Sequence, residues 1–308
     1  MQHVRVGSSG LVVSRICLGT GSFGGPIPEA QACAILDAAL DRGITTIDTA
    51  DVYPHAATNG SIGATEELIG RWMKGRRDEV VIATKGSYPT GPRAWQRGNG
   101  RRHLREAVEA SLRRLDTDHI DLYLAHADDP SVDLDETLGV LDDLTREGKI
   151  LHAGVSNWPA WRLGSALGRS LRPGIVRPLV AQTRYSLLHR AAEQDLFVLA
   201  QSERLAVFAY NTLYGGLLSS AKQSPVHGER PKVAIALDHI ARSLGRPLIE
   251  IAYGWALSSR SVTGIIVSAR RDEHLDAAVA ALDSPLEEST LRGLDELTQP
   301  WLGLVPPP

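Results

Sequence analysis

The regular alternation of short apolar runs with longer segments of helical periodicity is the feature that most constrains this chain. From Ile16 to Leu282, eight runs rich in β-branched or other apolar residues are each followed by a segment with apolar residues at helical spacing. Eight strand–helix units make a closed parallel barrel, whereas an open doubly wound sheet gives no reason for eight strands of similar length. The sequence therefore predicts an α/β fold, a (β/α)8 TIM barrel, as a single domain over residues 1–308.

Glycine, proline and polar clusters bound the predicted elements. We expect strands at Ile16–Leu18, Ile44–Ile47, Glu79–Lys85, His119–His126, Ile150–Val155, Leu179–Gln182, Leu205–Tyr210 and Gly264–Val267. We expect helices at Glu29–Arg42, Thr65–Lys74, His103–Leu115, Asp135–Glu147, from Pro159 onward, and at Ala192–Ser202, Pro231–Leu244, Pro247–Ser258 and Asp272–Leu282.

Both chain ends carry additional predicted structure. Val4–Val6 and Leu11–Val13 flank a Gly/Ser turn, which predicts a β-hairpin that caps one end of the barrel. Ser284–Thr298 is predicted to form a last helix. Gln299–Pro308 ends in three prolines, and we expect it to fold back as a C-terminal loop over the barrel mouth.

Composition narrows the class of partner. The net charge of -3 provides no global field that would attract nucleic acid or acidic lipid. No run approaches the roughly 18 apolar residues of a membrane span, and the first residues lack the apolar core of a signal peptide. Cys17 and Cys33 fall in apolar segments without metal-ligand spacing. We expect a cytoplasmic protein that binds small molecules, without metal, and leave its oligomeric state open.

A glycine-dense loop follows the first barrel strand. It contains Gly19-x-Gly21-x-x-Gly24, a spacing similar to the dinucleotide fingerprint. In that fingerprint a helix starts directly after the third glycine, but here Gly25-Pro26-Ile27-Pro28 intervenes. The segment therefore reads as a strand-end loop and not as a Rossmann site.

Reactive side chains stand at the ends of three successive strands. Asp48 and Tyr53 follow the second strand, Lys85 ends the third, and His126 ends the fourth. Parallel barrel strands place their carboxyl ends on one face, so these four side chains should converge. An ammonium beside a phenol lowers the pKa of that phenol, so we expect Lys85, paired with Asp48, to make Tyr53 a proton donor to a carbonyl oxygen. His126 is expected to donate or accept a hydrogen bond at the same oxygen.

Each of these residues has an ordinary alternative when it is considered alone. Asp48 fits a helix cap, Tyr53 a rim aromatic, Lys85 an exposed lysine and His126 a core histidine. Their common register at consecutive strand ends favours a joint catalytic role. A metal-dependent hydrolase on the same scaffold would need a His-x-His pair on an early strand, which this sequence lacks.

The segment from Gly86 to Arg102 has neither helical nor strand periodicity, so it is predicted to be a long surface loop at the same face. It reads equally as a solvated loop or as a lid over the substrate. Asp128 and Asp129 either hold substrate hydroxyls or cap the turn before Pro130. The candidates for the substrate pocket, by loop position, are Phe23, Tyr88, Trp95, Asp128, Asp129, Trp158, Tyr214 and Trp301.

Taken in order, five motifs resemble the aldo-keto reductase family. They are Gly43-x4-Asp48-Thr49-Ala50-x2-Tyr53, Val81–Lys85, Arg105–Leu115, Asp118–His126 and Gly148–Asn157. The similarity runs from about Val4 to Leu282. It implies a (β/α)8 barrel that binds NADP(H) in an extended pose, leaves NAD(H) open, and assigns acid–base catalysis to Tyr53 with Asp48, Lys85 and His126.

The resemblance also implies a cofactor site. Ser156, Asn157 and Gln182 match the positions that bind the nicotinamide carboxamide, and Tyr210 matches the aromatic that stacks on its ring. The further implied contacts are Gly19, Thr20, Gly21, Asp48, Asn211, Leu213, Gly216, Leu218, Ser268, Arg270 and His274. Asn211-Thr212-Leu213 stands where the family usually has Ser-Pro-Leu, so the loop at the pyrophosphate is expected to be less rigid.

The sequence thus favours an NADPH-dependent oxidoreductase that reduces aldehydes or ketones, or reversibly oxidises alcohols. An alternative on the same scaffold is a regulatory subunit that senses the redox state of the cofactor, similar to potassium-channel β subunits. The complete set of four reactive residues favours the enzyme, because binding alone does not require Lys85 and His126.

Overall fold

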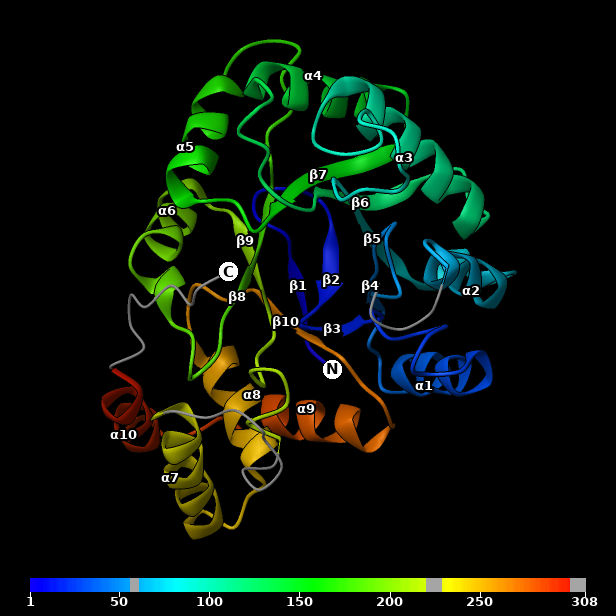
Figure 1. The fold of residues 1–308 in the computed structure, drawn as a ribbon. Coiled ribbons are helices and arrows are strands. Elements are labelled where there is room, and N and C mark those ends of the chain that lie inside the picture. Colours follow the sequence, from blue (N-terminus) through cyan, green and yellow to red (C-terminus); the bar gives the residue numbers. More distant parts are fainter. Residues whose placement is uncertain (56–60, 220–228, 300–308) are drawn as a thin grey trace.

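The barrel predicted from the sequence is present. A computed structural model describes residues 1–55, 61–219 and 229–299 of the chain. Eight parallel strands close in the order β10-β3-β4-β5-β6-β7-β8-β9 (Figure 1). Their bounds are β3 Ile16–Gly19, β4 Thr46–Asp48, β5 Val81–Gly86, β6 Ile120–Ala125, β7 Ile150–Ser156, β8 Val180–Arg184, β9 Ala206–Tyr210 and β10 Gly264–Val267. Most strand ends lie within two residues of the predicted ends.

Helices surround the barrel on its outside (Figure 1). Their bounds are α1 Glu29–Asp41, α2 Ala64–Met73, α3 Arg101–Leu115, α4 Leu134–Arg146, α5 Ala160–Arg169, α6 Leu196–Glu203, α7 Glu229–Ser243, α8 Leu248–Ser258, α9 Glu273–Asp283 and α10 Glu288–Thr298. The last helix begins four residues later than predicted. Ser284 precedes Pro285 and has ψ of 76°, because a residue before proline avoids the helical region.

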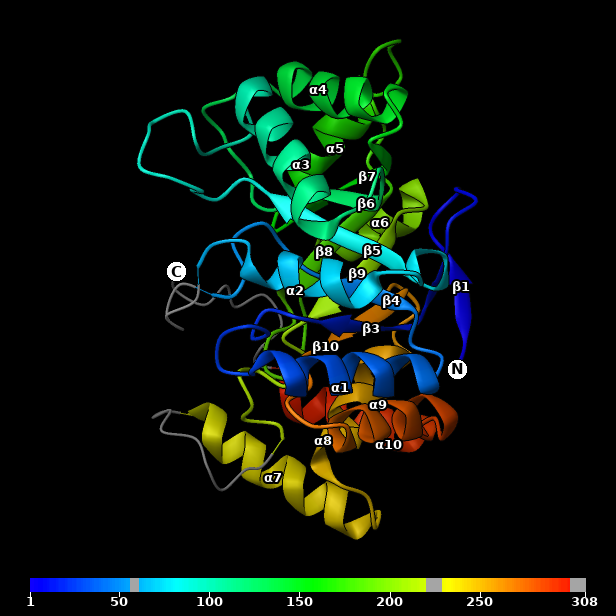
Figure 2. The same cartoon turned by 90° about the vertical axis from the view of Figure 1, so that its right-hand side faces the viewer.

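The predicted N-terminal hairpin closes one end of the barrel. Strands β1 (His3–Arg5) and β2 (Val12–Ser14) pair antiparallel. Val6 and Val13 are buried and pack in one cluster with the side chains that fill the barrel interior. Figure 2 shows the hairpin at the end of the barrel opposite to the long loop between β5 and α3. The open mouth is therefore the end at which the strands have their carboxyl termini.

Alternation along each strand separates two cores. On β6, Leu122 and Leu124 pack inside the barrel, whereas Tyr123 and Ala125 pack against the surrounding helices. On β5, Ala83 belongs to the interior cluster, so Lys85, two residues further on, points to the same side. Thr84 points to the helix side. This alternation directs the Lys85 ammonium into the mouth of the barrel.

The C-terminal tail is largely outside the described residues. Trp301 and the predicted mouth-covering tail, apart from Gln299, lie outside the described residues. That the whole chain forms one domain stays a prediction. Among residues 1–55, 61–219 and 229–299, no helix has the length and apolarity that a membrane crossing requires. Within the same ranges, no cluster of three or more histidine, cysteine or acidic side chains has the arrangement of a metal site.

Candidate active site

A buried ion pair lies at the base of the mouth. Lys85 Nζ is 2.7 Å from Asp48 Oδ1 and donates a second hydrogen bond to the Thr49 carbonyl oxygen at 2.7 Å. The Lys85 side chain has 0% exposure and that of Asp48 has 7%. Burial acts to lower the pKa of Lys85, but the neighbouring Asp48 and Tyr53 more than offset this and hold it above its ordinary value. Lys85 is therefore an ammonium at neutral pH.

The loop after β4 carries Tyr53 over this ion pair. The backbone continues to pair with β5, because Thr49 N–H donates to the Ala83 carbonyl and Asp51 N–H to the Lys85 carbonyl. The chain then turns back, with a hydrogen bond from Tyr53 N–H to the Ala50 carbonyl. As a result, Lys85 Nζ lies 5.4 Å from the centroid of the Tyr53 ring.

The net direction predicted for the pKa of Tyr53 is wrong. Burial raises the pKa of Tyr53, and the positive charge of Lys85 opposes this effect only in part. The physical reason is that Asp48 lies against Lys85 and cancels much of the field that reaches the phenol. Tyr53 is thus a neutral phenol at neutral pH.

His126 lies beside Tyr53 at the end of β6. Its ring centroid is 6.0 Å from that of Tyr53 and 4.7 Å from that of Tyr88, edge-on in both cases. Burial, supported by the positive charge of Lys85, lowers the pKa of His126 to about 2, so the imidazole is neutral. Its backbone N–H donates to Ser87 Oγ at 2.9 Å. The four predicted residues therefore converge as the strand register required.

A chain of polar side chains extends from Asp48 across the mouth to the ends of β8, β7 and β9. Gln182 Nε2 donates to Asp48 Oδ2 at 2.8 Å, and Ser156 Oγ lies 3.4 Å from Gln182 Oε1. Asn157 Nδ2 donates to Ser156 Oγ at 3.0 Å, and Tyr210 Oη donates to Asn157 Oδ1 at 2.6 Å. The residues implied for the nicotinamide site therefore form one connected row beside Lys85.

The glycine loop after β3 comes close to this site. A Cβ at Gly21 would lie 2.8 Å from His55 Nε2, and a Cβ at Gly19 would lie 2.8 Å from Ile266 Cγ2. A side chain at either position would therefore displace His55 or Ile266 from its present place. Thr20 is buried, and its hydroxyl donates to the Asp48 carbonyl oxygen at 2.9 Å.

The segment after β9 contains the residues implied for the pyrophosphate. Asn211 has φ of 55° and its Oδ1 accepts from Gly215 N–H at 2.7 Å, which closes a tight turn. Leu213 is half-buried, Gly216 is exposed and has φ of 92°, and Leu218 is fully buried. The Leu218 side chain therefore belongs to the core, and only its backbone is available to a ligand.

The residues implied for the adenosine end lie after β10. Ser268 and Arg270 are exposed, and Arg270 N–H donates to Nδ1 of the half-buried His274 at 3.2 Å. Arg271 pairs with Glu273 at 3.1 Å. Among the described residues, the guanidinium of Arg270 has no hydrogen bond or ion pair.

Two predicted features of the substrate pocket have a different role. Phe23 is fully buried in the core between the barrel and the helices, so its assignment to the pocket is wrong. The loop after Gly19 folds back, with Phe23 N–H bonded to the Thr20 carbonyl, and turns this ring inward.

Asp129 accepts from Ser131 N–H at 3.1 Å, which confirms the turn-capping alternative. Trp158 is buried, and Tyr214 is half-buried with φ of 48°.

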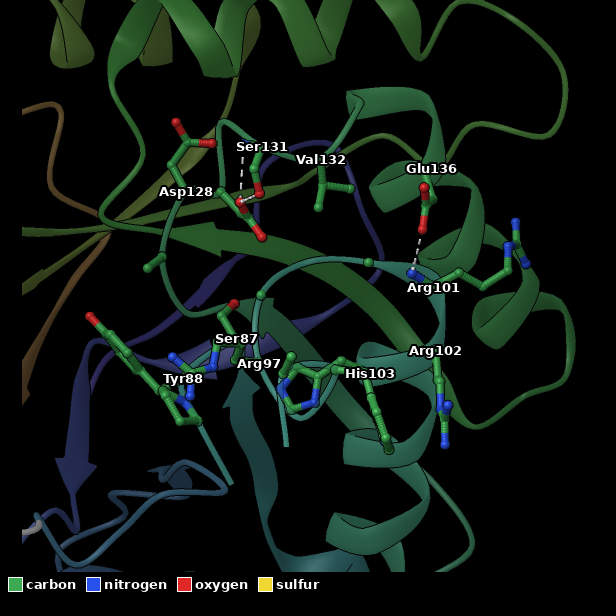
Figure 3. A pocket seen from close by; sticks show the side chains of 17 residues that line it. Ser87, Tyr88, Arg97, Arg101, Arg102, His103, Asp128, Ser131, Val132 and Glu136 are labelled. Atoms are coloured by element: carbon green, nitrogen blue, oxygen red, sulfur yellow. Dashed lines mark hydrogen bonds between the residues drawn. The ribbon is translucent and has the colours of Figure 1, made fainter. Parts of the chain in front are cut away.

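The long loop predicted from Gly86 to Arg102 is shorter, because β5 includes Gly86 and α3 begins at Arg101. It borders a cavity of about 590 Å³ (Figure 3). Tyr88 and Trp95 both line this cavity, as expected from their loop positions.

Two residues near the site were not anticipated. Ser87 accepts the His126 N–H and so ties the β5 loop to the end of β6. Asp51 is fully buried, and neither of its carboxylate oxygens has a hydrogen-bond partner among the described residues. The only signal in the sequence was the position of Asp51, three residues after Asp48 in an otherwise apolar stretch.

The sequence was also compared with known proteins. The family model of the aldo/keto reductase family matches residues 15–299. An uncharacterized oxidoreductase of Bacillus subtilis, YrpG, is 33% identical over 316 residues that cover 96% of each chain. Norsolorinic acid reductase A of Aspergillus parasiticus is 30% identical over 94% of this chain and 79% of its own. A probable voltage-gated potassium channel subunit beta of Arabidopsis thaliana is 29% identical over 92% of both chains.

The match extends over the barrel strands and the loops that carry the converging side chains. The chain belongs to the aldo/keto reductase family.

Proposed function

We propose that this protein is an NADPH-dependent oxidoreductase that reduces an aldehyde or ketone, or in reverse oxidises an alcohol. The observation that carries the proposal is the neutral phenol of Tyr53 above the buried Lys85–Asp48 ion pair, beside the neutral imidazole of His126. A protonated acid of this kind in a partly dry mouth is the group that carbonyl reduction requires.

The residues present fit a nicotinamide cofactor. Ser156, Asn157 and Gln182 offer hydroxyl and amide groups at the ends of β7 and β8, which suits recognition of a carboxamide. The half-buried ring of Tyr210 offers a flat face for stacking. When bound, a reduced nicotinamide supplies the hydride. The unpaired guanidinium of Arg270, with Ser268, would hold the 2'-phosphate that distinguishes NADPH from NADH.

The chain's own residues move the proton. Tyr53 Oη donates its proton to the carbonyl oxygen as that oxygen gains negative charge. Lys85, fixed by Asp48, stabilises the phenolate that remains. His126 is neutral and so orients the carbonyl through a hydrogen bond without adding charge.

The test is turnover of NADPH with an activated aromatic aldehyde, followed by the loss of the near-ultraviolet absorbance of NADPH. We expect turnover with NADPH to exceed that with NADH. Arg270→Ala is expected to raise KM for NADPH by about fivefold, the effect of one partly exposed ion pair, and to leave KM for NADH unchanged. Arg271→Ala is the matched control, because Arg271 already pairs with Glu273. Absence of turnover with every carbonyl tested would contradict the proposal.

A redox-sensing regulatory subunit is the second candidate, favoured by the similarity to the Arabidopsis channel subunit. Under this candidate the protein binds NADPH tightly but reduces no carbonyl in a broad panel. Calorimetric NADPH binding, measured beside the turnover assay, separates the two functions.

A further inference from the structure

A second compartment adjoins the proposed catalytic site. The cavity of about 590 Å³ lies between residues 87–103 and 127–136, and Figure 3 shows the side chains that line it. Tyr88, which lines the cavity, has its ring centroid 4.7 Å from that of His126. A molecule with its carbonyl at His126 would therefore pass Tyr88 to enter this space. The volume is in the range of small-molecule pockets.

Hydrogen bonds fix the inner wall of the cavity. Asn99 is buried, and its Nδ2 donates to the Ala127 carbonyl oxygen at 2.8 Å. Its own carbonyl oxygen accepts from Thr137 Oγ1 at 3.1 Å, and its Oδ1 accepts from Ser87 Oγ at 2.5 Å. Because Ser87 also accepts the backbone N–H of His126, this wall is tied to the backbone that carries the imidazole.

The acidic side chains at the cavity are already engaged. Asp128 forms an ion pair with Arg162 at 2.7 Å. Asp129 accepts from Asn99 N–H at 3.0 Å and from Ser131. Glu136 accepts from the backbone N–H of Arg101 at 2.8 Å, as drawn in Figure 3. Asp128 is therefore neutralised by a cation, and Asp129 and Glu136 are held in place by neutral donors.

Two basic side chains at the cavity have hydrogen-bonding groups without a partner among the described residues. Arg97 is exposed, and its guanidinium has no hydrogen bond or ion pair among the described residues. His103 is 2% exposed, and its Nε2 is buried without a partner in the described part of the chain. Burial lowers the pKa of His103, and its ring is hydrogen-bonded to the Tyr88 backbone. A neutral imidazole has one donor nitrogen and one acceptor nitrogen, and Nε2 is the one without a partner among the described residues.

These groups define the chemistry of a ligand. A guanidinium without a partner suits a carboxylate or phosphate, and a buried acceptor without a partner suits a hydroxyl. Arg102 already pairs with Glu106 and lies over the ring of Trp95, 4.8 Å from its centroid. Trp95 and Tyr88 remain half-exposed and offer flat apolar surfaces to an unsaturated ring.

We propose that this cavity binds the end of the substrate remote from the carbonyl, and that this end carries an anionic oxygen group beside a hydroxyl. Arg97 pairs with the anion, His103 Nε2 accepts from the hydroxyl, and Tyr88 and Trp95 flank the connecting ring. The inference rests on the proposed function, because it places the reacting carbonyl at Tyr53 and His126.

The test compares kcat/KM for four aldehydes. Benzaldehyde is neutral, 4-carboxybenzaldehyde and 4-formylphenyl phosphate each carry an anionic group, and 4-formylsalicylate carries a ring hydroxyl next to its carboxylate. We expect the anionic aldehydes to be preferred over benzaldehyde by about fivefold or more, and the hydroxylated one to be preferred further. Arg97→Ala should remove the preference for the anionic aldehydes over benzaldehyde. Arg113→Ala, an equal change in charge on an exposed residue of α3, is the control and should alter nothing. The two anionic arms decide between carboxylate and phosphate.

A binding measurement separates failure of this inference from failure of the proposed function. Calorimetry with 4-(hydroxymethyl)benzoate does not depend on turnover, and its affinity should fall in Arg97→Ala and at higher ionic strength. His103→Leu should remove only the increase in kcat/KM that the hydroxyl gives. If that variant does not fold, the comparison of 4-carboxybenzaldehyde with 4-formylsalicylate in the wild-type protein still tests the hydroxyl site. Reduction of benzaldehyde without any preference for the anionic compounds, or a preference that survives Arg97→Ala, would overturn the inference.

Discussion

Asp48 and Asp51 lie three residues apart in one loop, yet they have opposite surroundings. Asp48 faces the barrel mouth, where Lys85 and Gln182 each bind one of its oxygens. Asp51 is fully buried with no partner for either oxygen among the described residues. Burial, together with the neighbouring Glu66, raises the pKa of Asp51 well above its ordinary value, which favours the protonated form.

The strand β5 explains the difference. Lys85 points into the mouth, whereas Thr84 points to the helix side, where it donates to Glu66 Oε1 at 2.6 Å. Glu66 also pairs with Arg114 at 2.7 Å, so the one cation of this outer cluster is already engaged. The comparison teaches that a carboxylate in this barrel stays charged where a strand delivers a cation to it. The carboxylate at the mouth thus has a cation as its direct partner, whereas behind β5 Arg114 pairs with Glu66 and not with Asp51.

Removing the cation at the mouth should have the largest effect. Lys85→Met leaves the Asp48 carboxyl group buried without its cation, which costs about 3 kcal/mol or more of unfolding free energy. Turnover should fall by about 10³-fold, because the phenolate of Tyr53 loses its stabilising charge. Urea denaturation and steady-state kinetics measure the two effects.

The double variant Lys85→Met, Asp48→Asn is the matched control. It removes both charges, so stability should return toward that of the wild type while turnover stays low. A single variant Lys85→Met as stable and active as wild type would break the contrast between the two carboxyl groups.

Crowding behind β5 gives the next effect. A Cβ at Gly86 would lie 2.3 Å from Tyr123 Oη and 2.9 Å from Asp51 Oδ2. Gly86→Ala should therefore destabilise the protein by about 2 kcal/mol, as measured by chemical denaturation. In a Tyr123→Phe background the hydroxyl is absent, so the same substitution should cost less. An equal cost in both backgrounds would contradict this geometry.

The last effect is a trend with pH and concerns the protonation of Asp51. Its pKa is raised in the folded protein, so between the unfolded and folded pKa values the folded state holds one proton more, and stability falls as pH rises. Asp51→Asn removes this loss. Relative to wild type, the variant should gain up to about 1.4 kcal/mol per pH unit above about pH 4. Denaturation midpoints at acidic and neutral pH measure the trend, and a difference independent of pH would show that Asp51 is ionised when folded.

The sequence predicted the features that depend on strand register. Apolar periodicity located the eight strands and the ring of helices, and consecutive strand ends brought Asp48, Lys85 and His126 together. The Lys85–Asp48 pair could be predicted because the carboxyl ends of neighbouring parallel strands lie at the same end of a barrel.

The predictions that the structure contradicts depend on burial by segments that are distant in the sequence. The pKa of Tyr53 is raised because desolvation outweighs the field of Lys85. The extent of desolvation cannot be inferred from the spacing of nearby residues in the sequence. The inward turn of Phe23 follows from a loop that folds back on itself. Asp51 is buried near Glu66 of α2 and Arg114 of α3, and these neighbours could not be inferred from the residues next to it in sequence.

The most direct test of the central claim is single-turnover reduction of an activated aldehyde by Tyr53→Phe at saturating NADPH. We predict a rate lower by about 10³-fold, because the variant keeps the ring but has no proton to give. NADPH affinity, measured in the same samples by tryptophan fluorescence, should stay near that of wild type. Wild-type turnover in Tyr53→Phe would contradict the claim that this phenol is the acid.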